Sequence, residues 1–248
     1  TEKTTVSVLY NTNEIYFGIR CFDSEPKKIS EQQMSGDFDW GSDDDFEIML
    51  SPFNDNRNGY LFVINPNGAM ADVWLGDEGH DFNFDWNGIW DAKVTRDDKG
   101  WYAEVKIPCS TLKFKGESIQ VWGLNFERNI RRKKEQLLWQ AWSRIHGVEK
   151  ISQSGKLIGL ENIKQKERVE IIPFVTAGIQ SGVAGTEKRS EIGGEVNFDI
   201  TPTLKLNLTA NTDFAQVESD RREVNLSRFS LFYPEKRQFF LEGKSYFD

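Results

Sequence analysis

The sequence predicts an all-β protein, in which an antiparallel β-sandwich is followed by a second set of antiparallel strands. In the first part, short runs of β-branched and aromatic residues recur between turn residues such as Asn, Gly and Pro. All eight tryptophans lie within the first 142 of the 248 residues, so the composition changes along the chain. We therefore expect two domains, 1–164 and 165–248, that meet at the polar stretch 164–167.

The strands of the sandwich can be placed in order along the chain. Residues 6–10 and 14–21 flank the turn residues 11–13, which is the pattern of a β-hairpin. Further runs typical of strands are residues 46–50, 60–64, 101–107 and 119–126. Proline and glycine between these runs mark turns and strand ends. Many short strands at this spacing, with few helical periods, favour an antiparallel sandwich.

The second part of the chain alternates between apolar and polar residues. Leu204, Leu206 and Leu208 alternate with polar residues, and the run 192–200 has the same period. Residues 201–203 join these two runs tightly, whereas 181–189 form a looser connection. Strands of about ten residues with one apolar face are typical of a membrane β-barrel, here a truncated one. A solvent-exposed sheet with one buried face has the same period and is the alternative.

The composition argues against several classes of protein. The chain has 31 Lys or Arg and 39 Asp or Glu, a net charge of −8, so we expect no nucleic-acid partner. No run approaches the ~18 apolar residues that a membrane-spanning helix needs, and the polar first five residues do not have the pattern of a signal peptide. Cys21 and Cys109 lie in apolar strands and are expected to be buried free thiols.

An acidic and aromatic zone at residues 36–97 is the best candidate for a small-molecule site. It contains 14 Asp or Glu residues against three basic ones. Indole rings stack on the apolar faces of sugars while carboxylates bind hydroxyl groups, so we predict carbohydrate-binding residues here. The candidates are Trp40, Trp74, Trp86 and Trp90, and Trp40 is expected to be the most exposed because it lies in a polar loop. The alternative is that at least half of these rings are buried for packing alone.

The sequence contains two further clusters of charged residues, one acidic and one basic. Asp43, Asp44 and Asp45, together with Asp72, offer the hard oxygen ligands that calcium prefers, and plain solvation is the alternative. The basic run at residues 128–134 is predicted to be a solvated turn at a strand end.

No combination of residues indicates an enzyme. Glu47 and Glu104 lie within predicted strands and could face a cleft, but acidic residues are too common here for such a pair to stand out. With only His80 and His146, the chain has little material for a catalytic triad or a zinc site. We therefore expect no catalytic residues.

Several segments resemble known families. The segments similar to family 9 carbohydrate-binding modules are 9–23, 42–50, 58–68 with Asp72, 100–108 and 154–159. Residues 211–220 (NTDFAQVESD) and 232–243 (FYPEKRQFFLEG) resemble an uncharacterised bacterial family, in which such a module precedes an outer-membrane β-barrel.

The resemblance implies a β-sandwich that binds a polysaccharide or oligosaccharide, often with bound calcium, in the envelope of a Gram-negative bacterium. The module would face the periplasm or the cell surface and would serve carbohydrate capture or uptake, with the outer membrane as partner of the barrel. The resemblance also implies that the chain is a fragment, without the first strand of the sandwich, the signal peptide and most of the barrel.

One position departs from the family pattern. In sugar-binding members two aromatic residues clamp a terminal sugar, and Trp40 corresponds to the first of them. Val148 stands where the second is expected. The alternative is therefore a structural or protein-interaction sandwich that has lost sugar binding, and hydrolysis of glycosidic bonds is the remotest possibility.

Overall fold

The computed structural model describes residues 2–84, 86–140, 145–164, 169–182, 185–201 and 204–211. The chain divides into two compact units, Thr1–Lys166 and Glu167–Asp248, whereas the sequence placed the boundary between 164 and 165. All described sheets are antiparallel, and the described helical segments are short 3-10 turns, which confirms the predicted all-β fold. The segment 232–243, which carries part of the family resemblance, lies outside the described residues.

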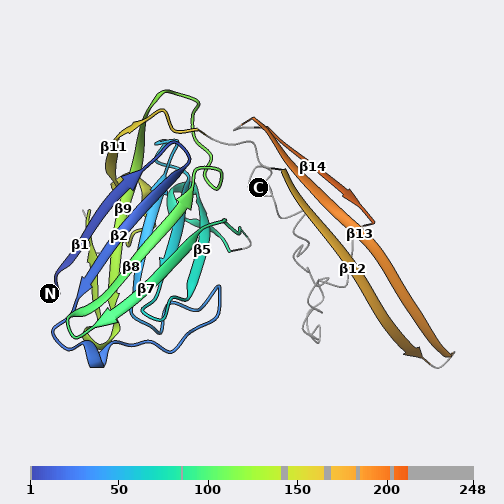
Figure 1. The fold of residues 1–248 in the computed structure, drawn as a ribbon, viewed down its shortest axis with the longest axis horizontal. Coiled ribbons are helices and arrows are strands. Elements are labelled where there is room, and N and C mark those ends of the chain that lie inside the picture. Colours follow the sequence, from blue (N-terminus) through green and yellow to red (C-terminus); the bar gives the residue numbers. More distant parts are fainter. Residues whose placement is uncertain are drawn as a thin grey trace, which may run out of the picture. The chain divides into compact units, whose positions relative to one another are not determined.

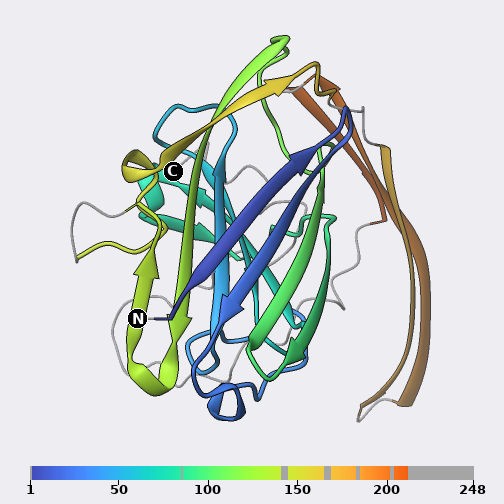
Figure 2. The same cartoon turned by 60° about the vertical axis from the view of Figure 1, so that its left-hand side comes forward.

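The first unit consists of two sheets that pack face to face (Figures 1 and 2). One sheet has the order β1 (Thr4–Tyr10), β2 (Glu14–Phe22), β8 (Gly100–Pro108), β7 (Asp91–Asp97). The other has the order β10 (Glu135–Leu138), β9 (Ile119–Ile130), β3 (Asp45–Ser51), β4 (Gly59–Ile64), β5 (Met70–Gly76), β6 (Asp81–Asn83), and β11 (Gly155–Glu161) also pairs with β9. The 3-10 turns are η1 (Pro26–Lys28), η2 (Asp77–Gly79), η3 (Arg131–Lys133) and η4 (Ile151–Gln153).

The β1–β2 hairpin forms at the predicted place. The side-chain oxygen Oδ1 of Asn11 accepts hydrogen bonds from the backbone N–H groups of Asn13 and Glu14, at 2.8 and 2.9 Å, and so closes the turn. Along β2, alternate residues from Ile15 to Cys21 are buried, which is the period-2 pattern of a strand with one face in the core.

The core lies between the two sheets, and a second apolar cluster lies on the outer face of the larger sheet. Along β3, Phe46, Ile48 and Leu50 point between the sheets, whereas Met49 points to the outer face. The chain around Phe38 and the segment 148–151 cover this outer face. Since both faces of β3 and β4 are covered, every residue of these strands is buried. The same covering segments enclose the pocket described below.

Both cysteines are buried and free, as predicted. Burial raises the pKa of the Cys21 thiol to about 12 and that of Cys109 to about 11. Neither thiol is therefore a reactive thiolate near neutral pH.

In the second unit, three strands form one sheet in the order β12 (Val169–Gly182), β13 (Gly185–Thr201), β14 (Leu204–Ala210) (Figure 1). The predicted alternation is present in the register, where Ile171 pairs with Val196 and Val196 with Leu208. Apolar side chains on these strands are exposed, namely Val169, Ile171, Val175, Ile192, Leu206 and Leu208. Among the described residues, none belongs to a helix with the length and apolar character that crossing a membrane requires.

Candidate functional site

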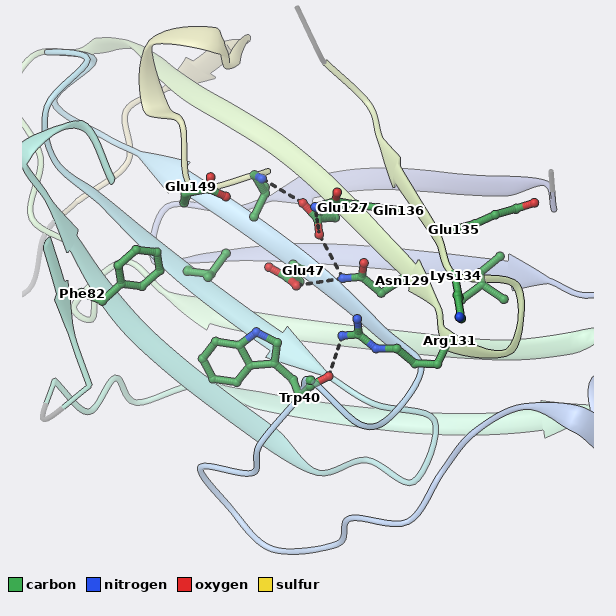
Figure 3. A pocket seen from close by; sticks show the side chains of 14 residues that line it. Trp40, Glu47, Phe82, Glu127, Asn129, Arg131, Lys134, Glu135, Gln136 and Glu149 are labelled. Carbon is green, nitrogen blue, oxygen red and sulfur yellow. Dashed lines mark hydrogen bonds between the residues drawn. The ribbon is translucent and has the colours of Figure 1, made fainter. Parts of the chain in front are cut away.

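A pocket of ≈ 600 Å³ opens on the outer face of the larger sheet (Figure 3). Its polar lining comes from Glu47 on β3, Glu127 and Asn129 on β9, and Glu135 and Gln136 on β10, with Arg131, Lys134 and Glu149 from the adjoining segments. Its apolar lining includes Trp40, Leu61, Phe82 and Val148. The volume lies within the range typical of small-molecule sites, about 300–1,000 Å³.

Strand alternation explains why polar side chains meet at this place. Phe46 and Ile48 enter the core between the sheets, so Glu47 between them must face outward. The same holds for Glu127 on β9, which lies between Phe126 and Arg128. Glu47 and Glu127 are direct cross-strand partners, as are Asp45 and Asn129.

Three carboxylates converge on one amide group. The Nδ2 atom of Asn129 lies 2.8 Å from Asp45 Oδ1, 3.1 Å from Glu47 Oε1 and 2.9 Å from Glu127 Oε1. Glu127 also accepts hydrogen bonds from Gln136 Nε2 and from the backbone N–H of Val148, both at 2.8 Å. Both oxygens of Glu127 are thus occupied by protein donors.

Arg131 connects the Trp40 loop to the carboxylates. Its Nη2 atom donates to Asp45 Oδ2 and to the carbonyl oxygen of Trp40, both at 2.6 Å, and its Nε atom donates to the carbonyl oxygen of Asp43 at 2.7 Å. One guanidinium therefore fixes the loop before β3 and offsets the charge of Asp45.

Two carboxyl groups of the cluster around Asn129, those of Asp45 and Glu47, have pKa values raised above their ordinary range. Burial raises the pKa of Asp45 to about 7, although Asn129 and Arg131 oppose the rise. Burial also raises the pKa of Glu47 well above its usual value, and the charges of Asp45 and Glu127 raise it further. The cluster therefore holds a proton in the neutral pH range.

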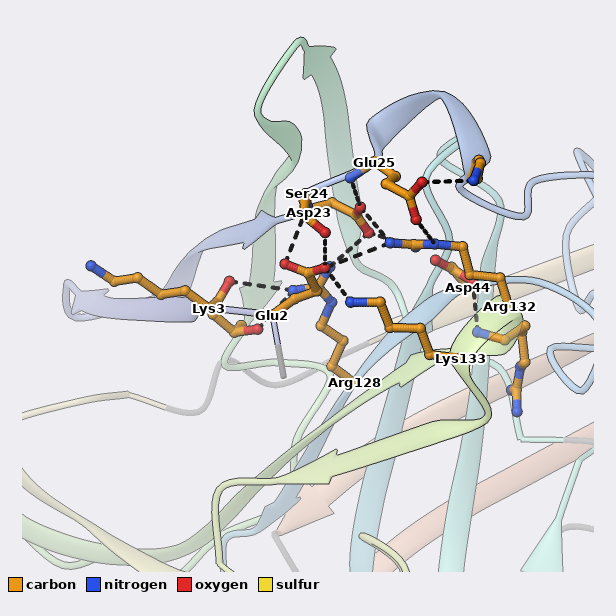
Figure 4. A network of polar contacts seen from close by, with 12 residues as sticks. Glu2, Lys3, Asp23, Ser24, Glu25, Asp44, Arg128, Arg132 and Lys133 are labelled. Atoms are coloured by element: carbon orange, nitrogen blue, oxygen red, sulfur yellow. Dashed lines mark hydrogen bonds and ion pairs between the residues drawn. The ribbon is translucent and has the colours of Figure 1, made fainter.

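An ion-pair network anchors the turn that carries Arg131 (Figure 4). Arg132 in η3 binds Asp23 through two hydrogen bonds of 2.6 and 2.7 Å, and Lys133 donates to Glu2. The hydrogen bond from Lys133, followed by that from Ser24, lowers the pKa of Glu2 to about 2. Arg128 is only 2% exposed and lies 3.8 Å from Asp23.

The predicted solvated turn at residues 128–134 is therefore wrong for Arg128, which is a buried charge held by one long-range ion pair with Asp23 and by hydrogen bonds to Lys3 and Thr4. The positive charges of this run form ion pairs with buried acidic side chains that lie far away in the sequence. A local charge pattern contains no information about those acidic groups.

Trp40 and Val148 line the same pocket, so the two positions expected to form a sugar clamp are brought together. Trp40 is half-buried, with its ring 6.4 Å from Phe38 and 6.1 Å from Phe84, between ring centres. Val148 is buried and contributes an aliphatic wall where a second ring was expected.

The structure does not bring the other three predicted tryptophans to this pocket. Trp74, Trp86 and Trp90 are partly buried and pack against the core between the sheets. Trp86 lies 4.9 Å from Tyr60 between ring centres, and the indole N–H of Trp90 donates to Asp72 at 2.7 Å. Packing decides their positions, which was the alternative stated for this zone.

The four predicted calcium ligands point into separate networks of N–H donors. Asp43 accepts from the backbone of Gln32 and Gln33 and from Asn65, whereas Asp72 accepts from Gly88 and Trp90. Asp44 accepts from the backbone N–H of Arg131, and Asp45 from Asn129 and Arg131. Within the described ranges, no group of three or more His, Cys, Asp or Glu residues is placed to hold a metal ion. These donor sets do not fit a shared calcium site, and calcium binding stays a prediction.

Most polar residues of the pocket were not found from the sequence. Glu127, Asn129, Gln136 and Glu149 carry no local motif. Glu47 offered the one available signal, a charged residue between apolar neighbours in a strand that reads as buried.

Comparisons with known proteins support the fold of the first unit. A solved structure from Bacteroides uniformis ATCC 8492, described as a candidate carbohydrate-binding protein, matches with a TM-score of 0.54 at 13% sequence identity. The match covers 63% of this chain and 78% of that chain. At this identity the likeness shows a shared fold.

The second unit matches a family model by sequence. The model describes a domain of unknown function, DUF5916, and matches residues 166–248. No curated protein sequence matches the chain. Neither comparison names family 9 of the carbohydrate-binding modules or a β-barrel, so both stay predictions.

Proposed function

We propose that the first unit binds carbohydrate in the pocket beside Trp40, without catalysing a reaction. The observation that carries the proposal is the combination of a half-exposed indole ring with carboxylate, amide and ammonium groups around one ≈ 600 Å³ pocket. The structural neighbour described as a candidate carbohydrate-binding protein supports it.

The lining suits a sugar because a pyranose ring has an apolar C–H face and a rim of hydroxyl groups. Trp40 offers a flat apolar surface, and Phe84, which is 60% exposed, extends it. Glu47, Gln136 and Lys134 supply acceptors and donors for hydroxyl groups around the same space.

A binding role fits the carboxylates better than hydrolysis does. Glycoside hydrolysis requires two free carboxyl groups, one as acid and one as base or nucleophile. Three hydrogen bonds from Asn129, Gln136 and Val148 hold both oxygens of Glu127 in place, which suits a fixed acceptor in a binding site.

Tryptophan fluorescence of the full chain, titrated with a panel of oligosaccharides, tests the proposal. Trp40→Ala should weaken binding by about thirtyfold, since removing a stacking ring from a binding contact costs on the order of 2 kcal/mol. The matched control is Trp139→Ala, because Trp139 is 51% exposed and does not line the pocket. Equal losses in both variants would contradict the role of Trp40.

One observation favours a second candidate function. Val148 closes the pocket where a second aromatic ring would complete a clamp. If no sugar in the panel changes the fluorescence, a protein-interaction sandwich becomes the better conclusion.

For the second unit, we propose that β12, β13 and β14 belong to an outer-membrane β-barrel, which would place the sandwich in a Gram-negative envelope and give it a role in polysaccharide capture or uptake. The exposed apolar side chains on alternate positions of these strands support this, because a lipid-facing strand has that pattern. Fractionation of the natural protein from its source cells is the test. Recovery in a soluble fraction, without detergent, would refute the proposal.

A further inference from the structure

Glu47 is a buried carboxylate with one oxygen left for a ligand. Glu47 is only 5% exposed, and its side chain lines the pocket. Oε1 accepts the hydrogen bond from Asn129. Oε2 accepts none from the described residues and is not among their buried side-chain atoms without a partner, so it is open to the pocket. Figure 3 shows this side chain between Asn129 and the part of the pocket where Trp40 and Phe82 lie. A carboxylate oxygen that has no protein donor and is open to the pocket can accept a hydrogen bond from a ligand.

The protein provides no cation for Glu47 and its neighbour Glu127. In the described part of the chain, neither carboxylate has a Lys, Arg or His nitrogen within 4.0 Å. Arg131 lies nearby but forms its ion pair with Asp45, at 2.6 Å. Glu47 and Glu127 therefore lack the positively charged partner that a buried carboxylate normally has.

The side-chain amide of Asn129 has too few hydrogens to satisfy the carboxylates around it. The Nδ2 group carries two hydrogens, yet oxygens of Asp45, Glu47 and Glu127 all lie within 3.1 Å of it. Two hydrogens cannot give three carboxylates a full hydrogen bond each. The cluster is therefore stabilised by an additional proton or by an additional cationic donor.

We propose that the pocket selects carbohydrates that carry a protonated amine, that is amino sugars, and that the ammonium group donates to Glu47 Oε2. The inference rests on the proposed function and adds the class of ligand. An ammonium group supplies both of the missing features, a positive charge and N–H donors. A neutral hydroxyl supplies the donor alone.

The charges that face Glu47 from the surrounding elements favour a cation. They are Asp45 from its own strand, Glu127 from β9, Glu135 from β10, Glu149 from the segment before η4, Arg131 from η3 and Lys134 after it. β4 and β6 contribute only the apolar Leu61 and Phe82. Arg131 is paired and Lys134 is exposed to solvent, so the buried part of the pocket is anionic.

Binding of the ammonium group should release the proton that the free cluster holds. A cation beside Glu47 stabilises the ionised carboxylate and so lowers the pKa that burial had raised. Affinity for an amino sugar should therefore rise as the pH increases from about 5 to 7. Affinity for the matching neutral sugar should not rise over this range.

Isothermal titration calorimetry of the full chain tests this with matched sugars, in which one substituent differs. The probes are glucose, galactose and mannose, their 2-amino forms, and glucuronate. At pH 7 an amino form should bind at least about tenfold more tightly than its neutral parent, since charge-assisted hydrogen bonds are roughly twice as strong as neutral ones. In wild-type protein, calorimetry in two buffers of different ionisation enthalpy should reveal proton release with the amino form.

Glu47→Gln keeps the shape of the side chain and should abolish the preference. Glu104→Gln, which removes an exposed glutamate from β8 in the other sheet, is the matched control and should keep it. If neutral sugars bind as tightly as amino forms, or glucuronate binds more tightly, the inference is overturned while the proposed function stands. If no sugar binds, both are overturned. If Glu47→Gln does not fold, proton release in the wild type still decides, and its absence overturns the inference.

Discussion

Raising the pH from about 5 to 8 should destabilise the first unit, because the folded chain holds protons on its buried carboxyl groups that the unfolded chain releases. In the unfolded state Asp45 ionises near its ordinary pKa of 3.8, and in the folded state near about 7. Each pKa unit is worth about 1.4 kcal/mol, so Asp45 alone corresponds to a loss of about 4 kcal/mol between about pH 4 and pH 7, of which about 3 kcal/mol falls above pH 5. The raised pKa values of Glu47, Asp44 and Asp72, each due first to burial, act in the same direction.

The assay is urea unfolding of the full chain, followed by tryptophan fluorescence at several pH values. All eight tryptophans lie within residues 1–142, so the signal reports on the first unit alone. The free energy of unfolding should be highest near pH 4 and should decrease as the pH rises to about 7. Below about pH 4 it should decrease again, because the lowered pKa of Glu2 adds stability that is lost as the pH falls toward its folded value of about 2.

Glu47→Gln is the decisive variant for this reasoning. It removes the ionisable group whose pKa burial raises well above its usual value, and should therefore flatten the decrease between pH 5 and 8. The exposed Glu104→Gln should leave the pH dependence as in the wild type. A stability that is constant or rises between pH 5 and 8 would refute the shared proton in the pocket.

Three further predictions follow from the same structure. Trp101→Ala should lower the free energy of unfolding in urea by about 3–5 kcal/mol, because Trp101 is fully buried. Trp40→Ala should lower it by less, because Trp40 is only half-buried, and equal losses would place Trp40 in the core. The melting temperature should be the same in excess EDTA and in millimolar calcium, since the predicted ligands already accept N–H donors, whereas a clear rise with calcium would support the calcium site that the sequence predicts. A fragment of residues 1–164 should melt cooperatively on its own, because both sheets and both apolar clusters of the first unit lie within it; an insoluble fragment would contradict the predicted boundary.

The sequence by itself determined the fold class and the positions of several strands along the chain. The alternation of Ile15, Phe17, Ile19 and Cys21 predicts a strand with one buried face, and β2 has that face in the core. The alternation at residues 192–200 and 204–210 likewise appears in β13 and β14. Such periods are local, because successive side chains in any strand point to opposite faces.

Only the tertiary structure decided which of the alternate faces is covered. Glu47 and Glu104 both lie within strands between apolar neighbours, yet Glu47 is buried in the pocket and Glu104 is exposed on β8. The difference arises because segments distant in sequence, around Phe38 and at 148–151, cover the outer face of the sheet that contains β3. The pairing of Glu47 with Glu127, 80 positions later, follows from the β3–β9 register, which no local pattern specifies. The pocket is a product of long-range pairing, and for that reason the sequence predicted Trp40 and the strand that carries Glu47 but neither β10 nor the convergence of Glu127 and Asn129 on Glu47.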